Sequence, residues 1–308
     1  MPDMHEYLKT APFDIYELHL FHLVAQHRSF TRAAAAANLT QSAVTRQVKN
    51  METSLGLALF ERTTRTVKLT PAGQALWRES VRLVGDIAQI LKSLREEFTD
   101  AKKEIRVGVS RSVGLAYLPG FFHANLRRLP QVGYRVSSLL SAEIFSSLDA
   151  NELEVGVLSP PRRLPATVRI THRFTDGFAL IGSPEAAADF ELHASTRAKR
   201  IAWMNRQNWL VLDERANTGR RLHAWMNRQG CRVAPGMQLD SFDLIINLAA
   251  LGMGVSFVPV RALALYSRKR TLRRLPWPER FERELVVVVR RNRQLPGHIF
   301  QFIENVLF

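Results

Sequence analysis

Hydrophobic spacing between residues 29 and 62 predicts two short helices separated by a tight turn. An alanine-rich run over 31–38 favours a first helix, and Thr31 is the expected N-cap residue. Leu39-Thr40 forms the expected turn, and Thr40 is placed to cap a second helix running from 41 to about 55. Apolar residues recur along this second helix at intervals of four, three and four: Val44, Val48, Met51 and Leu55. This spacing predicts one buried stripe and, together with the turn, a helix-turn-helix.

The remaining surface of the second helix carries polar side chains of the kinds that contact DNA. Gln and Arg hydrogen-bond adenine and guanine edges, whereas Ser, Thr and Lys suit bases or phosphates. The side chains expected to contact bases are Gln41, Ser42, Thr45 and Arg46, and Lys49 is expected to contact phosphate. The alternative is an ordinary helix pair with a solvated polar face, which is the commoner meaning of such a pattern in isolation.

The residues that follow favour the DNA interpretation. Positions 57–71 alternate like a two-stranded hairpin, or wing, that carries Arg62, Arg65 and Lys68. Arg62 and Arg65 are expected to lie on phosphate or in a narrow minor groove. The strings AAAAANLTQSAVTRQVKNME, LGLALFERT and VKLTPAG resemble the winged helix-turn-helix of LysR-type transcriptional regulators. The resemblance implies sequence-specific binding to double-stranded promoter DNA.

A long helix is predicted next, because Thr70 can cap a helix that has Pro71 at its first position. Its apolar residues recur every three or four positions: Trp77, Val81, Val84, Ala88, Leu91, Leu94 and Phe98. So narrow a stripe is typical of a coiled-coil seam, although a helix packed on its own core is the alternative. The resembled family uses this linker helix as its dimer contact. A homodimer through this helix, or a homotetramer, is therefore the expected assembly.

From residue 101 onward the pattern changes to alternating strands and helices. Strands are expected at 105–109, 134–140, 155–158, 178–182, 209–213, 255–259 and 285–289. Helices are expected at 115–129, 143–150, near 184–189, at 220–229 and 242–251, and from 297 to the end. Such alternation predicts a parallel sheet with right-handed crossovers. Two α/β lobes joined by crossings near 172–178 and 276–284 resemble the two-lobed, periplasmic-binding-protein-like effector domain of the same family.

These observations divide the chain into three parts. Residues 13–70 are expected to form the winged helix-turn-helix domain, 71–100 the linker and dimerisation helix, and 101–308 the effector-binding domain. Within the last part, lobe I is expected at about 103–174 and 280–308, and lobe II at about 175–279.

An effector site is expected where strands of the α/β domain end and helices begin, because free helix N–H groups collect there. By resemblance, the hydroxyls in these turns line the cleft between the lobes: Ser110, Ser112, Ser141 and Thr218. The alternative for each hydroxyl is that it only caps its helix. Arg111 offers a guanidinium that can hold a carboxylate through two hydrogen bonds, so a small organic anion is the hypothesised effector.

The net charge of +15 does not by itself support DNA binding, because of where the charge lies. Residues 1–100 carry a net charge of +1, whereas residues 101–308 carry +14. The DNA argument therefore depends on the second helix. The charge of the larger part is interpreted first as scattered solubilising arginine, and otherwise as an attraction for DNA or an anionic ligand.

Several classes of protein are disfavoured by what the sequence does not contain. The chain has no apolar run as long as a membrane span and no signal-peptide pattern, so a cytoplasmic protein is expected. No catalytic motif is recognised, and the pair His19 and His22 has no third ligand at matching spacing, so no enzyme, metal site or cofactor is expected. The single cysteine, Cys231, cannot form an internal disulfide, and a packed or idle thiol is favoured over a redox role.

The favoured function is a ligand-responsive, sequence-specific transcriptional regulator, which would also contact RNA polymerase if it is an activator. The alternatives are an enzyme or solute-binding protein built on the two lobes, and a non-specific DNA-compacting protein.

Overall fold

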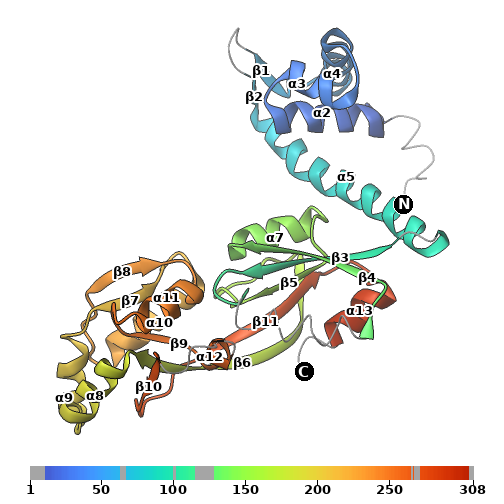
Figure 1. Ribbon diagram of the computed structural model, residues 1–308. Helices are drawn as coiled ribbons and strands as arrows, with labels where there is room; N and C mark the ends of the chain where they lie inside the picture. Colours follow the sequence, from blue (N-terminus) through green and yellow to red (C-terminus); the bar gives the residue numbers. More distant parts are fainter. Residues whose placement is uncertain are drawn as a thin grey trace. The chain divides into compact units, whose positions relative to one another are not determined.

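The computed structural model describes residues 11–62, 67–99, 102–114, 128–264, 266 and 271–304 (Figure 1). The chain separates into two compact units, one extending to Leu94 and one beginning at Arg95. Each unit is described by itself below. In the described part of the chain, no helix is long and apolar enough to cross a bilayer.

The first unit is a small helical domain with a hairpin. Its elements are α2 (Ile15–His27), α3 (Phe30–Ala37), α4 (Gln41–Leu55), β1 (Phe60–Arg62) and β2 (Val67–Leu69). The predicted stripe of α4 is confirmed, because Val44, Val48 and Met51 are at most 1% exposed and pack with Phe21 of α2. Burial of these side chains is the main stabilisation of the domain.

The helix caps confirm one prediction and correct another. Thr40 caps α4, since its hydroxyl accepts a hydrogen bond from the Ala43 N–H at 3.2 Å. The N-cap of α3 is Ser29 and not Thr31, because the Ser29 backbone is extended and its hydroxyl accepts from the Arg32 N–H at 3.3 Å. The helix therefore begins at Phe30, whose buried ring joins the domain core.

The predicted wing is present as an antiparallel pair in which Phe60 lies opposite Leu69 and Arg62 opposite Val67. The partly buried carboxylate of Glu52 on α4 accepts from the N–H groups of Leu59 and Phe60, at 2.8 and 3.1 Å. These two bonds fix the start of the wing on the second helix of the helix-turn-helix.

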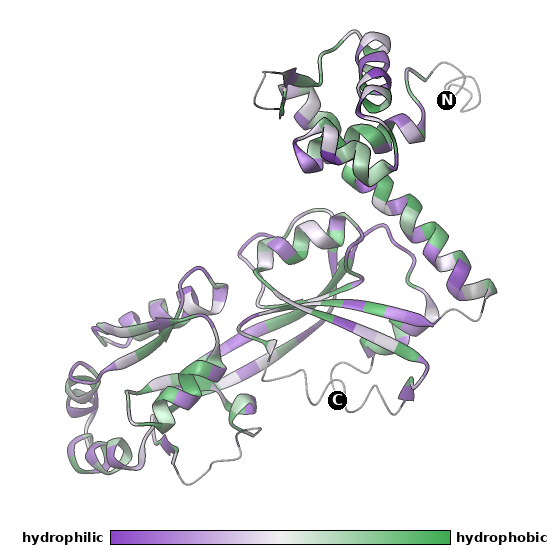
Figure 2. Cartoon of the chain, turned by 45° about the horizontal axis from the view of Figure 1, so that its top comes forward, coloured by the Kyte–Doolittle hydropathy of each residue, from purple (hydrophilic) through white to green (hydrophobic). Residues whose placement is uncertain are grey.

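The linker helix α5 (Pro71–Phe98) begins where predicted, with the Thr70 hydroxyl accepting from the Gly73 N–H at 3.0 Å. The ring of Trp77 stacks on that of His22, with the two ring centroids 4.5 Å apart. Trp77 therefore belongs to the core of the first domain and not to an exposed seam. Further along, hydrophobic and hydrophilic residues alternate along α5 (Figure 2). The exposed large apolar side chains of this helix are Leu83, Ile90, Leu91, Leu94 and Phe98.

The second unit is built on a seven-stranded mixed sheet. Its strands follow the order β10-β6-β11-β5-β3-β4, and β9 also pairs with β6. The strands are β3 (Lys103–Ser110), β4 (Val132–Leu139), β5 (Val155–Leu158), β6 (Val168–Gly182), β9 (Ser256–Pro259), β10 (Arg273–Leu275) and β11 (Glu282–Arg290). A separate parallel pair is formed by β7 (Trp209–Leu212) and β8 (Pro235–Leu239). The helices are α7 (Ser141–Asp149), α8 (Pro184–His193), α9 (Arg197–Met204), α10 (Asn217–Arg228), α11 (Phe242–Ala250), α12 (Val260–Ala264) and α13 (Gly297–Glu304).

The prediction of a parallel sheet holds only for part of this unit. Strand β3 is parallel to β4 and β5, but β11 is antiparallel to β5 and β6, and β9 and β10 are antiparallel to β6. The rule for strand–helix–strand units does not apply to β11, because β11 brings the chain back from the second lobe. The two predicted crossings correspond to β6 and the beginning of β11, which pair along one ladder shared by both lobes.

Most other predicted elements are confirmed with shifted ends, and 155–158 is confirmed without change. The strand predicted at 178–182 is only the end of β6, which has 15 residues. The elements α2, α9, β8, α12 and β10 were not predicted. The helix predicted at 115–129 falls mainly outside the described residues.

Candidate nucleic-acid interface and ligand pocket

Helix α4 presents the expected polar surface on the side away from its buried stripe. Gln41, Ser42, Arg46 and Lys49 are exposed, and Thr45 is partly exposed. Neither Arg46 nor Lys49 forms an ion pair within the part of the chain described. Five of the side chains predicted to contact DNA therefore lie on this helix, with their polar groups accessible to a partner.

The wing places its predicted contacts less completely. Arg62 ends β1, and Lys68 is exposed in the centre of β2. Arg65 lies outside the described residues, so it stays a prediction from the sequence.

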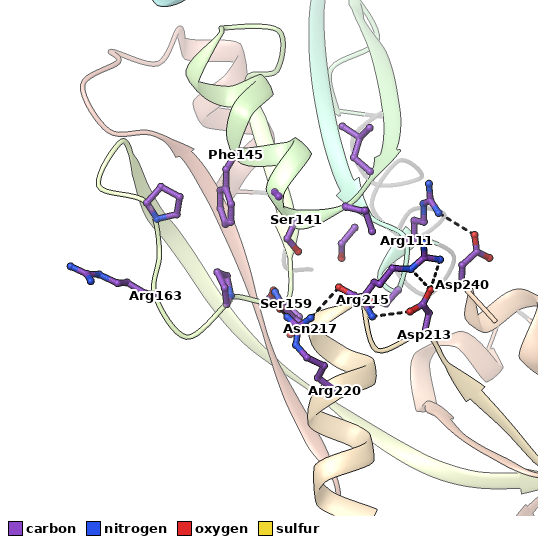
Figure 3. Close-up of a pocket in the computed structure, with 18 residues that line it drawn as sticks. Arg111, Ser141, Phe145, Ser159, Arg163, Asp213, Arg215, Asn217, Arg220 and Asp240 are labelled. Carbon is purple, nitrogen blue, oxygen red and sulfur yellow. Dashed lines mark hydrogen bonds and ion pairs between the residues drawn. The ribbon is translucent and has the colours of Figure 1, made fainter. Parts of the chain in front are cut away.

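A pocket of about 480 Å³ lies between the two lobes of the second unit (Figure 3). One side is formed by the turn after β3, the beginning of α7 and the segment after β5. The other side is formed by the turns that follow β7 and β8 and by the first turn of α10. The lining residues are Ser110, Arg111, Ser112, Leu139, Leu140, Ser141, Ala142, Phe145, Ser159, Pro161, Arg163, Pro165, Asp213, Arg215, Ala216, Asn217, Arg220 and Asp240.

Four of the five predicted effector residues line this pocket: Ser110, Arg111, Ser112 and Ser141. The fifth, Thr218, is fully buried and does not line it. The Thr218 hydroxyl lies 3.3 Å from that of Ser112 and accepts a hydrogen bond from Arg283 at 3.1 Å. Thr218 therefore belongs to the packing beneath the pocket.

That packing is a buried cluster centred on Arg283, which is 0% exposed. Its guanidinium donates to the Asp176 carboxylate, opposite it on β6, at 2.9 and 3.0 Å. It also donates to Ser112 in lobe I at 3.2 Å, besides its bond to Thr218 in lobe II. One side chain thus links the two crossing strands to both walls of the pocket.

Charged side chains at the pocket are mostly paired inside the chain. Arg111 contacts Asp240 of the opposite lobe at 3.2 Å. Arg215 donates to Asp213 at 2.6 Å, and its hydrogen bonds hold the pKa of that carboxyl below its usual range. Arg220 donates to the Asn217 side chain and to nearby carbonyls.

The polar groups of the pocket leave hydrogen-bonding capacity unused. Ser110 and Ser159 are 7% and 2% exposed, and their hydroxyls have no hydrogen-bond partner among the described residues. The residues before the two helices that begin at the pocket, Leu140 before α7 and Ala216 before α10, accept no side-chain cap hydrogen bond, whereas the N-cap side chains of α4, α8, α9 and α11 each do. At α7 the Glu143 carboxylate accepts from the Leu140 N–H at 2.7 Å. Uncapped N–H groups and unpartnered hydroxyls suit an oxygen-rich ligand.

Several pocket residues were not predicted. Ser159 directly follows β5, so the strand-end rule that selected Ser110 could have found it. Arg215 lies in the connection before α10, and Arg220 lies in the first turn of α10, two residues after the predicted Thr218. No sequence signal marks Arg163 or the buried pair of Arg283 and Asp176, since their positions depend on how the lobes meet.

Cys231 is buried, and burial raises the pKa of its thiol to about 11. The thiol is therefore protonated near neutral pH, unlike the low-pKa thiolates of redox-sensing cysteines.

Comparisons with known proteins agree with this architecture. The model of the "LysR substrate binding domain" matches residues 99–307, and that of the "Bacterial regulatory helix-turn-helix protein, lysR family" matches residues 15–74. The chain belongs to the LysR family of DNA-binding transcriptional regulators, which carry a substrate-binding domain for a small-molecule effector.

Relatives match over nearly the whole chain. The RuBisCO operon transcriptional regulator of Allochromatium vinosum is 27% identical, with 94% of each chain covered. The regulator YofA of Bacillus subtilis is 26% identical, with 94% of this chain and 97% of that protein covered.

Solved structures show the same fold at lower identity. A full-length point variant of OxyR from Pseudomonas aeruginosa has a TM-score of 0.70 at 20% identity, covering 96% of this chain and 94% of that chain. CbnR in complex with its target DNA has a TM-score of 0.63 at 19% identity, covering 96% and 99%.

Proposed function

We propose that the exposed side of α4 recognises the operator sequence of this regulator. Gln41, Ser42, Thr45 and Arg46 contact base edges, and Lys49, Arg62 and Arg65 contact phosphate or the minor groove. The observation that carries this assignment is the separation of α4 into a buried apolar stripe and an exposed polar side. The regulator works in the cytoplasm as a dimer or tetramer on promoter DNA, and contacts RNA polymerase if it activates transcription.

The effector is a small organic anion with an apolar body. Four arginines line the pocket against two aspartates, which leaves a positive surplus there. Leu139, Phe145, Pro161 and Pro165 form its apolar lining. A volume of about 480 Å³ falls within the size range of small-molecule sites. Unpartnered hydroxyls at Ser110 and Ser159, with the uncapped helices, provide donors for a carboxylate.

Effector binding regulates the contact between the lobes. The Arg111–Asp240 ion pair joins lobe I to lobe II directly at the pocket. An effector carboxylate competes with Asp240 for the Arg111 guanidinium. This competition gives the ligand a different affinity for the two arrangements of the lobes, which is what regulation requires.

Replacing Arg111 by alanine is expected to weaken carboxylate binding by about 10- to 100-fold, because a hydrogen bond to a charged group contributes about 1.5–3 kcal/mol. Asp240→Asn is expected to strengthen the same binding several-fold, because it removes the competing charge. The measurement is the ligand-induced shift in melting temperature across a library of carboxylates.

Arg135→Ala is the matched control, since Arg135 is an exposed lobe I arginine outside the pocket. Equal ligand shifts in wild type and Arg111→Ala would reject the carboxylate contact. A carboxylate that binds Asp240→Asn no better than wild type would reject the competition.

A further inference from the structure

The part of lobe II between residues 197 and 232 carries an unusual concentration of positive charge. It contains nine lysine and arginine residues and only two acidic ones. Two of the nine, Arg215 and Arg220, belong to the effector pocket. Residues 1–100, which include the linker helix as well as the DNA-binding domain, have a net charge of +1.

The fold brings the two ends of this segment together. The Arg232 N–H donates to the Asn205 side chain at 2.8 Å, which joins the end of α9 to the residues that follow α10. The side chain of Ile201 lies 3.7 Å from the position that a Cβ on Gly230 would occupy. Arg197 stands one turn before Ile201 on α9 and therefore shares its side of the helix.

Four exposed arginines lie within four residues of Ile201, Asn205 or Gly230, which these contacts join: Arg197, Arg206, Arg228 and Arg232. We call this surface the basic face. None of the four forms an ion pair within the described residues. Glu279 acts on Cys231 together with Arg197 and so lies near this face, but the arginines outnumber it. The remaining positive charge favours a polyanionic partner.

The neighbours of the basic face indicate what kind of polyanion it suits. The exposed residues between its arginines include the amides Asn205 and Asn227. No large apolar side chain of the segment 197–232 is among the exposed ones. The face therefore lacks the aromatic or aliphatic anchor of a protein–protein hot spot. Guanidinium groups and side-chain amides are among the groups that contact a phosphate backbone.

We propose that the basic face of lobe II binds the DNA phosphate backbone when the regulator is on DNA. The inference rests on the DNA-binding function of the family, but not on which α4 residues read bases. Contacts to the backbone carry no sequence information, and they add affinity to that of α4 and the wing.

The test compares two full-length triple variants that remove the same charge. Arg197→Ala with Arg228→Ala and Arg232→Ala removes the basic face, and Lys103→Ala with Arg135→Ala and Arg169→Ala removes exposed lobe I charge. Binding to a random-sequence duplex is followed by fluorescence anisotropy from about 50 to 200 mM salt. Each lost phosphate contact lowers the slope of log affinity against log salt by about 0.9.

In the basic-face variant, the magnitude of this slope is expected to fall by about 2–3, and the affinity is expected to fall roughly tenfold. In the control variant, the magnitude of the slope is expected to fall by less than about 1. Equal losses in both variants would show a general effect of net charge and overturn the proposal. An unchanged basic-face variant would overturn it as well. Melting curves of both variants establish that they are folded.

A photo-crosslinking residue gives a second readout that does not depend on affinity. Placed at Asn227 it is expected to crosslink to bound DNA, and placed at Arg135 it is not. Absence of a crosslink at Asn227 would contradict the proposal. If α4 does not read bases, the wild-type protein would show no sequence preference. The two triple variants would still differ in salt slope and affinity, so the two proposals can be distinguished.

Discussion

Replacing Leu91 by glutamate is expected to convert the regulator into a monomer and to weaken its binding to a two-site operator by about 10²- to 10⁴-fold. Leu91, Leu94 and Phe98 are 53%, 48% and 74% exposed on α5. Apolar side chains repeated at intervals of three and four form the seam of a coiled coil, and a dimer would bury two copies of each. A glutamate at this position would place two carboxylates in that seam, unsolvated and close together.

The loss of DNA affinity follows from the loss of the second reading domain. When one domain of a dimer is bound to its half-site, the second domain is held near the other half-site at a high effective concentration. The dimer therefore binds the two half-sites much more tightly than a single domain binds one. Ser93→Glu adds the same charge on the opposite side of α5 and is expected to stay dimeric and to bind normally. Sedimentation and operator titration measure both properties. A Leu91→Glu protein that sediments as a dimer would contradict the assignment of the seam.

Replacing Arg283 by methionine is expected to lower the free energy of unfolding of the effector domain by about 3–5 kcal/mol. The substitution leaves the carboxylate of Asp176, which is 2% exposed, without its counter-ion. It also removes the donor that joins Ser112 of lobe I to Thr218 of lobe II. Urea unfolding, followed through the tryptophans of lobe II, measures the loss.

The matched control for this prediction removes both charges. Because a buried ion pair replaced by apolar residues is often nearly neutral, Asp176→Leu combined with Arg283→Met is expected to be more stable than Arg283→Met alone. If the double variant is as unstable as the single one, the cost arises from lost packing over Phe178 and Phe242 and not from the unpaired carboxylate.

Elements whose sequence pattern matches their burial could be predicted from sequence. Helix α4 has a single apolar stripe, and β5 is buried along its whole length, so both were recognised with correct or nearly correct ends. The first part of β6 was missed because it crosses between lobes, and residues such as Arg169 and Arg173 are exposed there. The direction of β11 was predicted wrongly because the chain returns from the second lobe through this strand. The residues of β11 alone do not indicate which strands it pairs with or in which direction.

The candidate sites could be predicted to different extents for the same reason. The α4 contacts lie on one helix, so local periodicity was enough to place them. The pocket hydroxyls of Ser110 and Ser141 follow from the strand-end rule. The ion pair between Arg111 and Asp240 and the cluster around Arg283 join residues far apart in the chain. These groups come together only because the two lobes pack against each other, so no spacing in the sequence could predict their contacts.

The most direct test of base reading by α4 is selection of duplexes from a random pool by wild type and by Arg46→Ala, with affinities measured on the selected and on random DNA. Wild type is expected to enrich a short motif repeated at two half-sites. Arg46→Ala should lose about 1–3 kcal/mol on that motif, or about 5- to 150-fold, with little change on random DNA. Arg78→Ala, which removes an exposed charge from α5, should keep the preference. Equal losses by Arg46→Ala on both kinds of DNA, or no enriched motif, would contradict the account.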